Sequence, residues 1–290
     1  MPGLIHWMDD FPLRIAIPFA FWLFCCGACI GSFLNVVVYR LPLGKNLSRP
    51  PSSCPSCNQR IRWYDNIPII SWICLKGRCR NCKEPIAIRY LLVEGIVASS
   101  FMLLGIAEPI TAGSVLPGDY EIQDVNIWMI FLTHLALLTT LLGAGLIWRD
   151  HGRVPARLFS TLLVILVVAQ FVAPDFYPQL ASEGSQRGLT LLAGLVTGLL
   201  AGGVLFLLER LLCGKSSISV LASLAIVGMV LGWQLTAAAM VVVAGCYLLF
   251  QLAVGRRRPL PVLLFTAAAS LLLIVRWQWW LDLLSAAFPA

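Results

Sequence analysis

The chain has 290 residues, of which 59% are hydrophobic and only 12% are charged. A soluble globular domain carries about 25% charged residues, so this composition excludes an ordinary soluble protein. The net charge of +7 needs no nucleic acid to explain it, because lysines and arginines gather in particular loops, as they do in membrane proteins.

Apolar runs long enough to cross a hydrocarbon core of about 30 Å recur along the chain. The first span is predicted over residues 14–39, and a polar, proline-rich segment follows over residues 40–89. That segment holds ten lysines and arginines against two acids, Asp65 and Glu84. The positive-inside rule therefore predicts that the segment is cytoplasmic and that the N-terminus lies outside.

Seven further spans complete a predicted all-α polytopic bundle of about eight transmembrane helices. Loops rich in Lys and Arg alternate with loops that lack this excess, as a multi-pass topology requires. The tail, residues 276–288, carries three tryptophans and is predicted to lie along the membrane interface. The seven spans are expected at residues 90–106, 127–148, 158–173, 188–208, 220–232, 235–254 and 260–274.

The most specific chemical signal is a pair of C-x2-C motifs in the cytoplasmic segment. Each motif presents two thiolates to one tetrahedral ion, and two motifs complete a closed shell of four. A closed shell has no open position for water, so we expect a structural zinc. The alternatives are free thiols or two disulfides, and a reducing compartment disfavours disulfides. The expected ligands are Cys54, Cys57, Cys79 and Cys82.

A second set of polar residues lies along the same loop and at its membrane face. These residues could capture a charged amine and the carboxylate of a cofactor. The alternative is that residues 65–68 form a simple turn and that the arginine at the membrane face only snorkels. The set comprises Asp65, Asn66, Arg80, Arg89 and Glu94.

Several stretches of this region match one known family almost letter for letter. They are GSFLNVVVYRLP at residues 31–42, WYDNIPIISW at 63–72, the second cysteine motif, and IRY with VE at 88–94. Over its first third the chain resembles the prepilin leader peptidase/N-methyltransferase family. The resemblance implies a bacterial inner-membrane protein with three parts: a first helix (1–39), a cytoplasmic zinc-binding domain resembling a methyltransferase (40–90), and a peptidase-like bundle (91–290).

The resemblance also implies an activity for the zinc loop. In this family the cytoplasmic domain methylates the new amino terminus of type IV prepilins and pseudopilins, using S-adenosylmethionine. Prepilins or pseudopilins are therefore the implied partners, together with the membrane, and S-adenosylmethionine is the implied cofactor beside zinc.

The peptidase half departs from the family at the position of its first aspartate. Family members cleave the leader with two aspartates, and an aspartic peptidase needs two carboxylates that share a proton. The first lies in a motif of the form I-D-x-D-H-x-x-x-P-D-x-L, which corresponds here to IWRDHGRVPARL at residues 147–158. Trp148 takes the place of the water-activating aspartate, and an indole cannot act as a general base.

The second aspartate belongs to a G-x-G-D motif, and the corresponding loop, residues 213–219, contains no acid. A relocated pair of Asp150 and Glu209 is the remaining candidate, because both lie at inner helix ends. The alternative is that each of these acids pairs with a neighbouring cation. The sequence therefore predicts either a prepilin-processing enzyme with its methyltransferase module retained, or an inactive pseudoenzyme that binds prepilins as a scaffold.

Overall fold

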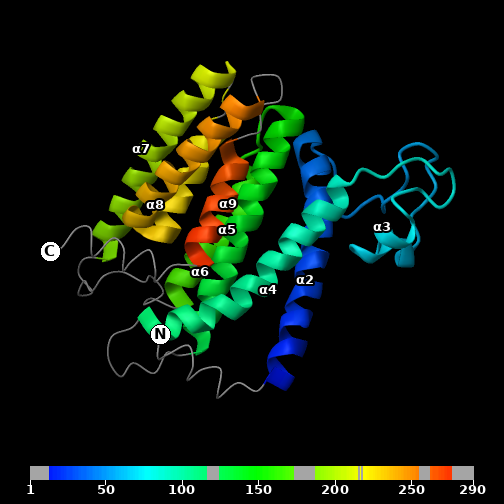
Figure 1. The fold of residues 1–290 in the computed structure, drawn as a ribbon, viewed down its shortest axis with the longest axis horizontal. Coiled ribbons are helices and arrows are strands. Elements are labelled where there is room, and N and C mark those ends of the chain that lie inside the picture. Colours follow the sequence, from blue (N-terminus) through cyan, green and yellow to red (C-terminus); the bar gives the residue numbers. More distant parts are fainter. Residues whose placement is uncertain are drawn as a thin grey trace. The chain divides into compact units, whose positions relative to one another are not determined.

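The computed structural model describes residues 13–115, 124–172, 187–214, 216, 218–254 and 262–275, and every regular element within them is helical (Figure 1). The chain divides into two compact units, Met1–Ile106 and Ala107–Ala290. The predicted interfacial tail at 276–288 lies outside the described residues.

The first unit contains two long helices joined by the polar loop. They are α2 (Leu13–Arg40) and α4 (Arg89–Val115). The loop holds three short elements, η1 (Leu41–Leu43), η2 (Trp63–Asn66) and α3 (Ile70–Cys74). Because this unit extends to Ile106, it includes the first part of α4, which the sequence assigned to the peptidase-like bundle.

Two glycines let the backbones of α2 and α4 approach closely. A Cβ added at Gly27 would lie 2.8 Å from the Cα of Ala98, and one added at Gly31 would lie 2.8 Å from the Cα of Glu94. Small residues at such spacing are typical of helix pairs in membranes, where close packing replaces the hydrophobic driving force. This contact fixes Glu94 against α2, beside the loop.

The second unit is a bundle of five described helices. They are α5 (Asp124–His151), α6 (Arg157–Val172), α7 (Arg187–Cys213), α8 (Ser219–Val254) and α9 (Val262–Val275). Glycines again form a close contact: a Cβ at Gly198 of α7 would lie 2.2 Å from the carbonyl oxygen of Leu224 in α8, and one at Gly228 of α8 would lie 1.9 Å from that of Gly194. The backbones of α7 and α8 therefore meet with no side chain between them.

The helix α8 joins two spans that the sequence predicted as separate, 220–232 and 235–254. Their apolar stretches are still recognisable within it as Ser219–Leu231 and Thr236–Ala253. The backbone remains helical through residues 232–235. The residues of the predicted tight turn are therefore part of one helical element.

The path of α8 nevertheless reverses, as the predicted turn requires. A straight helix of 36 residues would be about 54 Å long at 1.5 Å per residue. Yet Leu221, near its start, lies against Gly202 of α7. Near its end, the ring of Phe250 lies 5.5 Å from that of Phe265 in α9, a helix whose first N–H bonds to Glu209 of α7. Both ends therefore lie near the C-terminal half of α7, and α8 is bent between them.

Five described segments are long and apolar enough to span a membrane. Three shorter apolar stretches accompany them: Arg157–Leu166, Ser219–Leu231 and Val262–Val275. The chain is a multi-pass membrane protein, and the predicted all-α class with a four-cysteine loop between the first two helices is confirmed. The five long segments are Ile17–Leu43, Arg89–Ala107, Trp128–His151, Leu192–Leu212 and Thr236–Ala253.

Candidate metal centre and its surroundings

The first cysteine motif lies in a tight hairpin. An isolated antiparallel bridge between Ser53 and Arg60 closes it. Inside the bridge, the N–H of Cys54 donates to the carbonyl of Gln59 at 3.0 Å, and the N–H of Asn58 donates to the carbonyl of Cys54 at 2.9 Å. Asn58 has a φ of 54°, a left-handed conformation that asparagine tolerates better than most residues.

The second cysteine motif repeats this hairpin. A bridge between Arg78 and Pro85 closes it. The N–H of Cys79 donates to the carbonyl of Glu84 at 2.8 Å, and the N–H of Lys83 donates to the carbonyl of Cys79 at 3.1 Å. Lys83, which follows the second cysteine just as Asn58 follows Cys57, also has a positive φ, 63°. Both motifs therefore present their thiols from the same local fold.

The two hairpins bring all four thiols together. Their sulfur atoms lie within 4.8 Å of one another, and the Sγ atoms of Cys54 and Cys82 are 3.8 Å apart. Four thiolates bound at about 2.3 Å to a tetrahedral ion lie about 3.8 Å from each other. All four cysteines are free of disulfides. The cluster therefore fits a tetrahedral metal ion, as a structural zinc site requires.

Backbone and side-chain donors prepare two of these thiols for a metal. The pKa of Cys57 is lowered to about 6, mainly by the backbone N–H of Gln59 and next by the amide of Asn81, whose Nδ2 lies 3.6 Å from the sulfur. The backbone N–H groups of Cys82 and Asn81 lower the pKa of the Cys79 thiol. Hydrogen bonds to sulfur favour the thiolate, which is the form that binds metal.

The Cys82 thiol is the opposite case. The backbone N–H of Glu84 lowers its pKa, but lost solvation and the three neighbouring cysteines outweigh this effect and raise the pKa to about 12. Four thiolates so close together repel one another without a cation between them. The cluster is therefore stable as a set of thiolates only around a positive ion.

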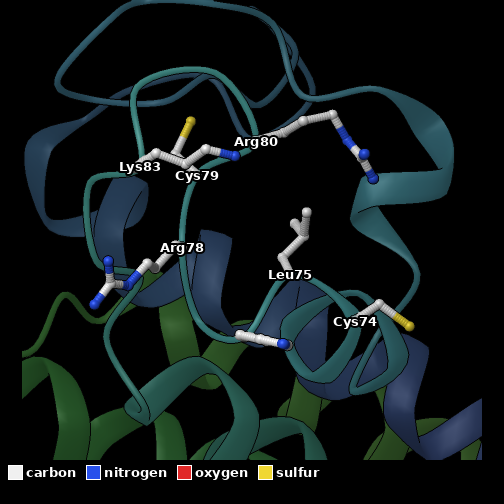
Figure 2. A pocket seen from close by; sticks show the side chains of 7 residues that line it. Cys74, Leu75, Arg78, Cys79, Arg80 and Lys83 are labelled. Carbon is white, nitrogen blue, oxygen red and sulfur yellow. The ribbon is translucent and has the colours of Figure 1, made fainter.

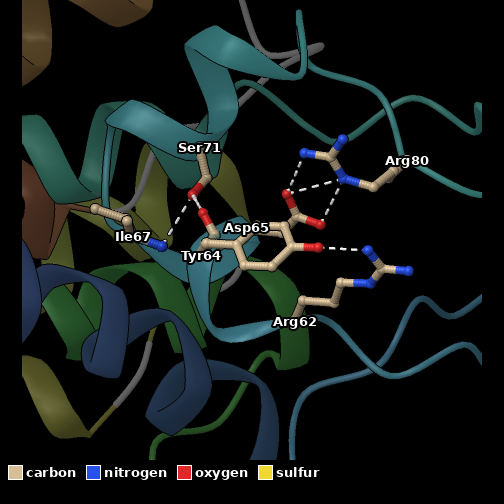
Figure 3. Close-up of polar contacts among 6 residues, drawn as sticks. All are labelled: Arg62, Tyr64, Asp65, Ile67, Ser71 and Arg80. Carbon is tan, nitrogen blue, oxygen red and sulfur yellow. Dashed lines mark hydrogen bonds and ion pairs between the residues drawn. The ribbon is translucent and has the colours of Figure 1, made fainter.

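Next to the metal cluster, Arg80 binds Asp65 with two parallel contacts (Figure 3). Its Nε donates to Oδ2 at 2.8 Å and its Nη2 donates to Oδ1 at 2.7 Å. Hydrogen bonds from this guanidinium hold the pKa of the Asp65 carboxyl below its usual range. The guanidinium also lies over the ring of Tyr64, 5.6 Å from its centre, and the hydroxyl of Tyr64 accepts a hydrogen bond from Arg62. The sequence placed Asp65 and Arg80 in one set, but gave no sign of Tyr64.

The buried carboxylate of Glu94 holds the loop to α4. Its Oε2 accepts the N–H of Ile69 at 2.7 Å. Ile69 has φ 64° and ψ −57°, and the N–H of Ile70 reaches back to the carbonyl of Pro68 at 2.6 Å. This is a γ-turn of the positive-φ kind, which is rare and strained, above all for a β-branched residue. The bond to Glu94 stabilises it.

The two remaining predicted polar residues lie at the ends of helical elements. Asn66 ends η2 and is exposed, and Arg89 begins α4 and is half-buried. The structure thus joins Asp65 with Arg80 and places Glu94 on the γ-turn. Ser71 also belongs to this network, because its hydroxyl accepts the N–H of Ile67 and donates to the carbonyl of Tyr64, both at 2.9 Å (Figure 3).

A basic hollow lies beside the second hairpin (Figure 2). Its volume is about 580 Å³, within the size of small-molecule sites. Four of its lining residues are cations, so it favours an anionic group. It is lined by Cys74, Leu75, Lys76, Arg78, Cys79, Arg80 and Lys83.

At the expected peptidase position, α5 ends with Trp148 half-buried and Asp150 exposed. The N–H of Gly152, whose φ is 70°, closes this helix end on the carbonyl of Trp148 at 2.8 Å. Glu209, the other acid considered, is buried in α7, and its Oε1 accepts the N–H of Val262 at 3.2 Å. A carboxylate there complements the positive end of the α9 dipole. This contact gives Glu209 a structural partner that the sequence did not suggest.

Comparison with known proteins finds relatives of the first unit, which holds the four-cysteine loop. Residues 25–107 match the family model of the bacterial peptidase A24 N-terminal domain. The chain is 54% identical over 76 residues to a prepilin leader peptidase/N-methyltransferase of Myxococcus xanthus, a match that covers 26% of this chain and 23% of the relative. It is 44% identical over 107 residues to a protein of the same description from Dickeya chrysanthemi, covering 29% of this chain and 38% of that one.

A longer match extends into the second unit. The chain is 31% identical over 206 residues to a type 4 prepilin-like proteins leader peptide-processing enzyme of Escherichia coli, covering 65% of each chain. The chain thus spans less than two thirds of the length of each of these three relatives. No solved structure matches.

Proposed function

We propose that this chain, which belongs to the prepilin leader peptidase/N-methyltransferase family, acts on type IV prepilins or pseudopilins as an N-methyltransferase and has lost leader cleavage. The observation that carries the proposal is the contrast between an assembled four-thiol loop and a peptidase position occupied by Trp148. The protein would lie in the bacterial inner membrane, with its N-terminus outside and the loop in the cytoplasm, as the excess of basic residues in that loop favours.

Structural zinc would fix the loop in this proposal. The four sulfur atoms already lie at distances that suit one tetrahedral ion. The ligands would be Cys54, Cys57, Cys79 and Cys82. A closed shell of thiolates contributes folding energy and takes no part in the reaction. Zinc would therefore hold Asp65, through Arg80 of the second hairpin, in a fixed place.

S-adenosylmethionine supplies an activated methyl group when bound, and we place its amino-acid part at the ion pair of Arg80 and Asp65. The four cations that line the basic hollow would repel its sulfonium, so the hollow is not proposed to hold the rest of the cofactor. Arg80 would meet the carboxylate of the amino-acid part, and Asp65, bound to the same guanidinium, would meet the amine. Asn66, Arg89 and Glu94 complete the proposed polar set.

The loss of cleavage rests on proton chemistry. Hydrolysis by an aspartic peptidase requires one carboxylate that activates water and a second carboxyl group that donates a proton. The chain has an indole at the first position, and no acid at all between Glu209 and Asp282. Glu209 bonds to the backbone of α9, which suits a structural role better than a relocated general base.

A methylation assay tests the proposal. Purified chain, reconstituted with zinc, would be mixed with methyl-labelled S-adenosylmethionine and a pilin peptide that already has its mature amino terminus. We expect label in the peptide, and loss of that label in Arg80→Gln while zinc content is unchanged. Absence of label with the zinc-loaded protein would contradict the proposal.

A second candidate function is a scaffold that binds prepilins without catalysis. It is favoured by one observation: the carboxylates of Asp65 and Glu94 already hold partners within the loop, Arg80 and the N–H of Ile69. This candidate predicts that the chain captures a prepilin with its leader still attached while transferring no methyl group, so the same assay with a binding step separates the two.

A further inference from the structure

The short helix α3 has an apolar face that no described part of the first unit covers. Ile70 and Ile73 are 57% and 58% exposed. The other side of the helix faces the loop: Ser71 is buried, and the Trp72 indole donates from Nε1 to the carbonyl of Ile86 at 3.2 Å. The two exposed isoleucines therefore form the apolar face of an amphipathic helical turn.

The position of α3 along α4 shows where that face lies. Ile69, the residue before α3, donates its N–H to Glu94. Glu94 follows Arg89 by five residues, which is about 7.5 Å along a helix axis. Its Cα also packs against Gly31, about 13.5 Å along α2 from Arg40 at the same rise per residue. The loop thus turns back toward the apolar stretch of α2, and Figure 1 shows α3 beside α2 rather than beyond its end.

The backbone around α3 is also suited to a surrounding without water. The N–H of Ile67 donates to the Ser71 hydroxyl and that of Ile69 to Glu94. The N–H groups of Ile70, Ser71 and Ile73 donate to backbone carbonyls of the same segment. Non-helical backbone at membrane depth is tolerated only when its polar groups are satisfied in this way.

The cations near α3 indicate an anionic partner. Lys76 lies two residues after the end of α3, and the basic hollow that it lines also holds Arg78 and Lys83. Lysines and arginines beside a short apolar segment are attracted to anionic lipid headgroups, and their apolar neighbours enter the acyl boundary.

We propose that α3 dips into the membrane interface on the side of the zinc loop, with Ile70 and Ile73 among the lipid chains and Lys76 at an anionic phospholipid headgroup. The segment would thereby fix the height of the zinc loop above the bilayer. The inference does not depend on the proposed function, because it uses only the first unit's contacts and charges.

Lipid photocrosslinking tests this proposal on the full-length chain. A photoreactive residue is introduced as Ile73→p-benzoylphenylalanine, and separately as Ile70→p-benzoylphenylalanine. The protein is then placed in nanodiscs of equal parts phosphatidylcholine and phosphatidylglycerol with labelled lipid. The matched control is Ile61→p-benzoylphenylalanine, because Ile61 is also an exposed isoleucine (40%) but its N–H bonds within the first hairpin, to Ser52.

We expect several-fold more labelled lipid on positions 70 and 73 than on position 61. The yield should fall in nanodiscs of phosphatidylcholine alone, and Lys76→Gln should remove that difference between the two kinds of disc. Zinc content checks folding, and if one of the two α3 variants loses zinc, the other carries the test. Lipid yields at 70 and 73 no higher than at 61 would overturn the proposal.

Discussion

The zinc loop and the second unit depend on their functional side chains to different degrees. In the loop, the four thiols are themselves the centre around which two hairpins fold. In the second unit, the glycine contact between α7 and α8 holds the bundle, and the expected catalytic position lies at a helix end, where Trp148 is only half-buried. We therefore expect loss of a thiol to unfold the loop, whereas a change at position 148 can remove catalysis and leave the bundle folded.

The largest expected effect is on the loop. Cys82→Ser removes one of four thiolates, and because structural zinc in small sites supplies on the order of 10 kcal/mol of folding free energy, we expect purified protein with almost no bound zinc. Elemental analysis of the purified protein measures this. Cys74→Ser is the matched control, since Cys74 is an exposed free cysteine outside the cluster, and it should keep its zinc. Equal zinc in both variants would refute the site.

Disruption of the backbone contact between α7 and α8 should destabilise the bundle without affecting the loop. Gly198→Ala puts a Cβ 2.2 Å from the Leu224 carbonyl oxygen, and overpacking of this kind costs about 1–3 kcal/mol. We expect a lower midpoint of thermal unfolding in detergent with normal zinc content. Gly203→Ala, where nothing lies within 4 Å of the added Cβ, should leave the midpoint unchanged or slightly higher, because alanine favours helix. Two variants with the same midpoint would show that the α7–α8 contact is not tight.

The smallest effect concerns the ion pair beside the metal cluster. Asp65→Asn removes the bidentate contact with Arg80, whose side chain is 53% exposed, so we expect a loss of at most about 1 kcal/mol. Arg80 lowers the pKa of Asp65, so the contribution is present at neutral pH and is lost as the pH falls through that lowered pKa. Thermal midpoints of both proteins should therefore converge as the solution is acidified. A constant difference down to acid pH would argue against this ion pair.

The loop was predictable because its chemistry has a fixed spacing. Two C-x2-C motifs predicted a tetrahedral cluster, and the sulfur atoms do gather. The partners of Asp65 and Glu94 were harder to predict from the sequence. One is an arginine fifteen residues away, and the other is the backbone N–H of Ile69, which a strained turn directs to Glu94. The sequence gives no sign of this turn, because a β-branched residue such as isoleucine rarely adopts a positive φ.

The bundle was predictable in its class and its spans, because apolar length alone identifies membrane helices. The helical backbone that joins the two apolar runs of α8 was not predictable, since Gly232 and Trp233 between these runs resemble a turn. The contact of Glu209 with the N–H of Val262 joins residues far apart in the sequence. Only the packing of α9 against the bundle brings them together.

Leader cleavage is the most direct test of the central claim that the loop is intact while the peptidase centre is lost. Purified, zinc-loaded chain would be incubated with a full-length prepilin in detergent, and the release of the leader followed by mass spectrometry. The account predicts no cleavage above that of a blank, both for the unaltered chain and for Asp150→Ala. Leader release at ordinary turnover, abolished by Asp150→Ala or Glu209→Ala, would contradict it and identify a relocated catalytic pair.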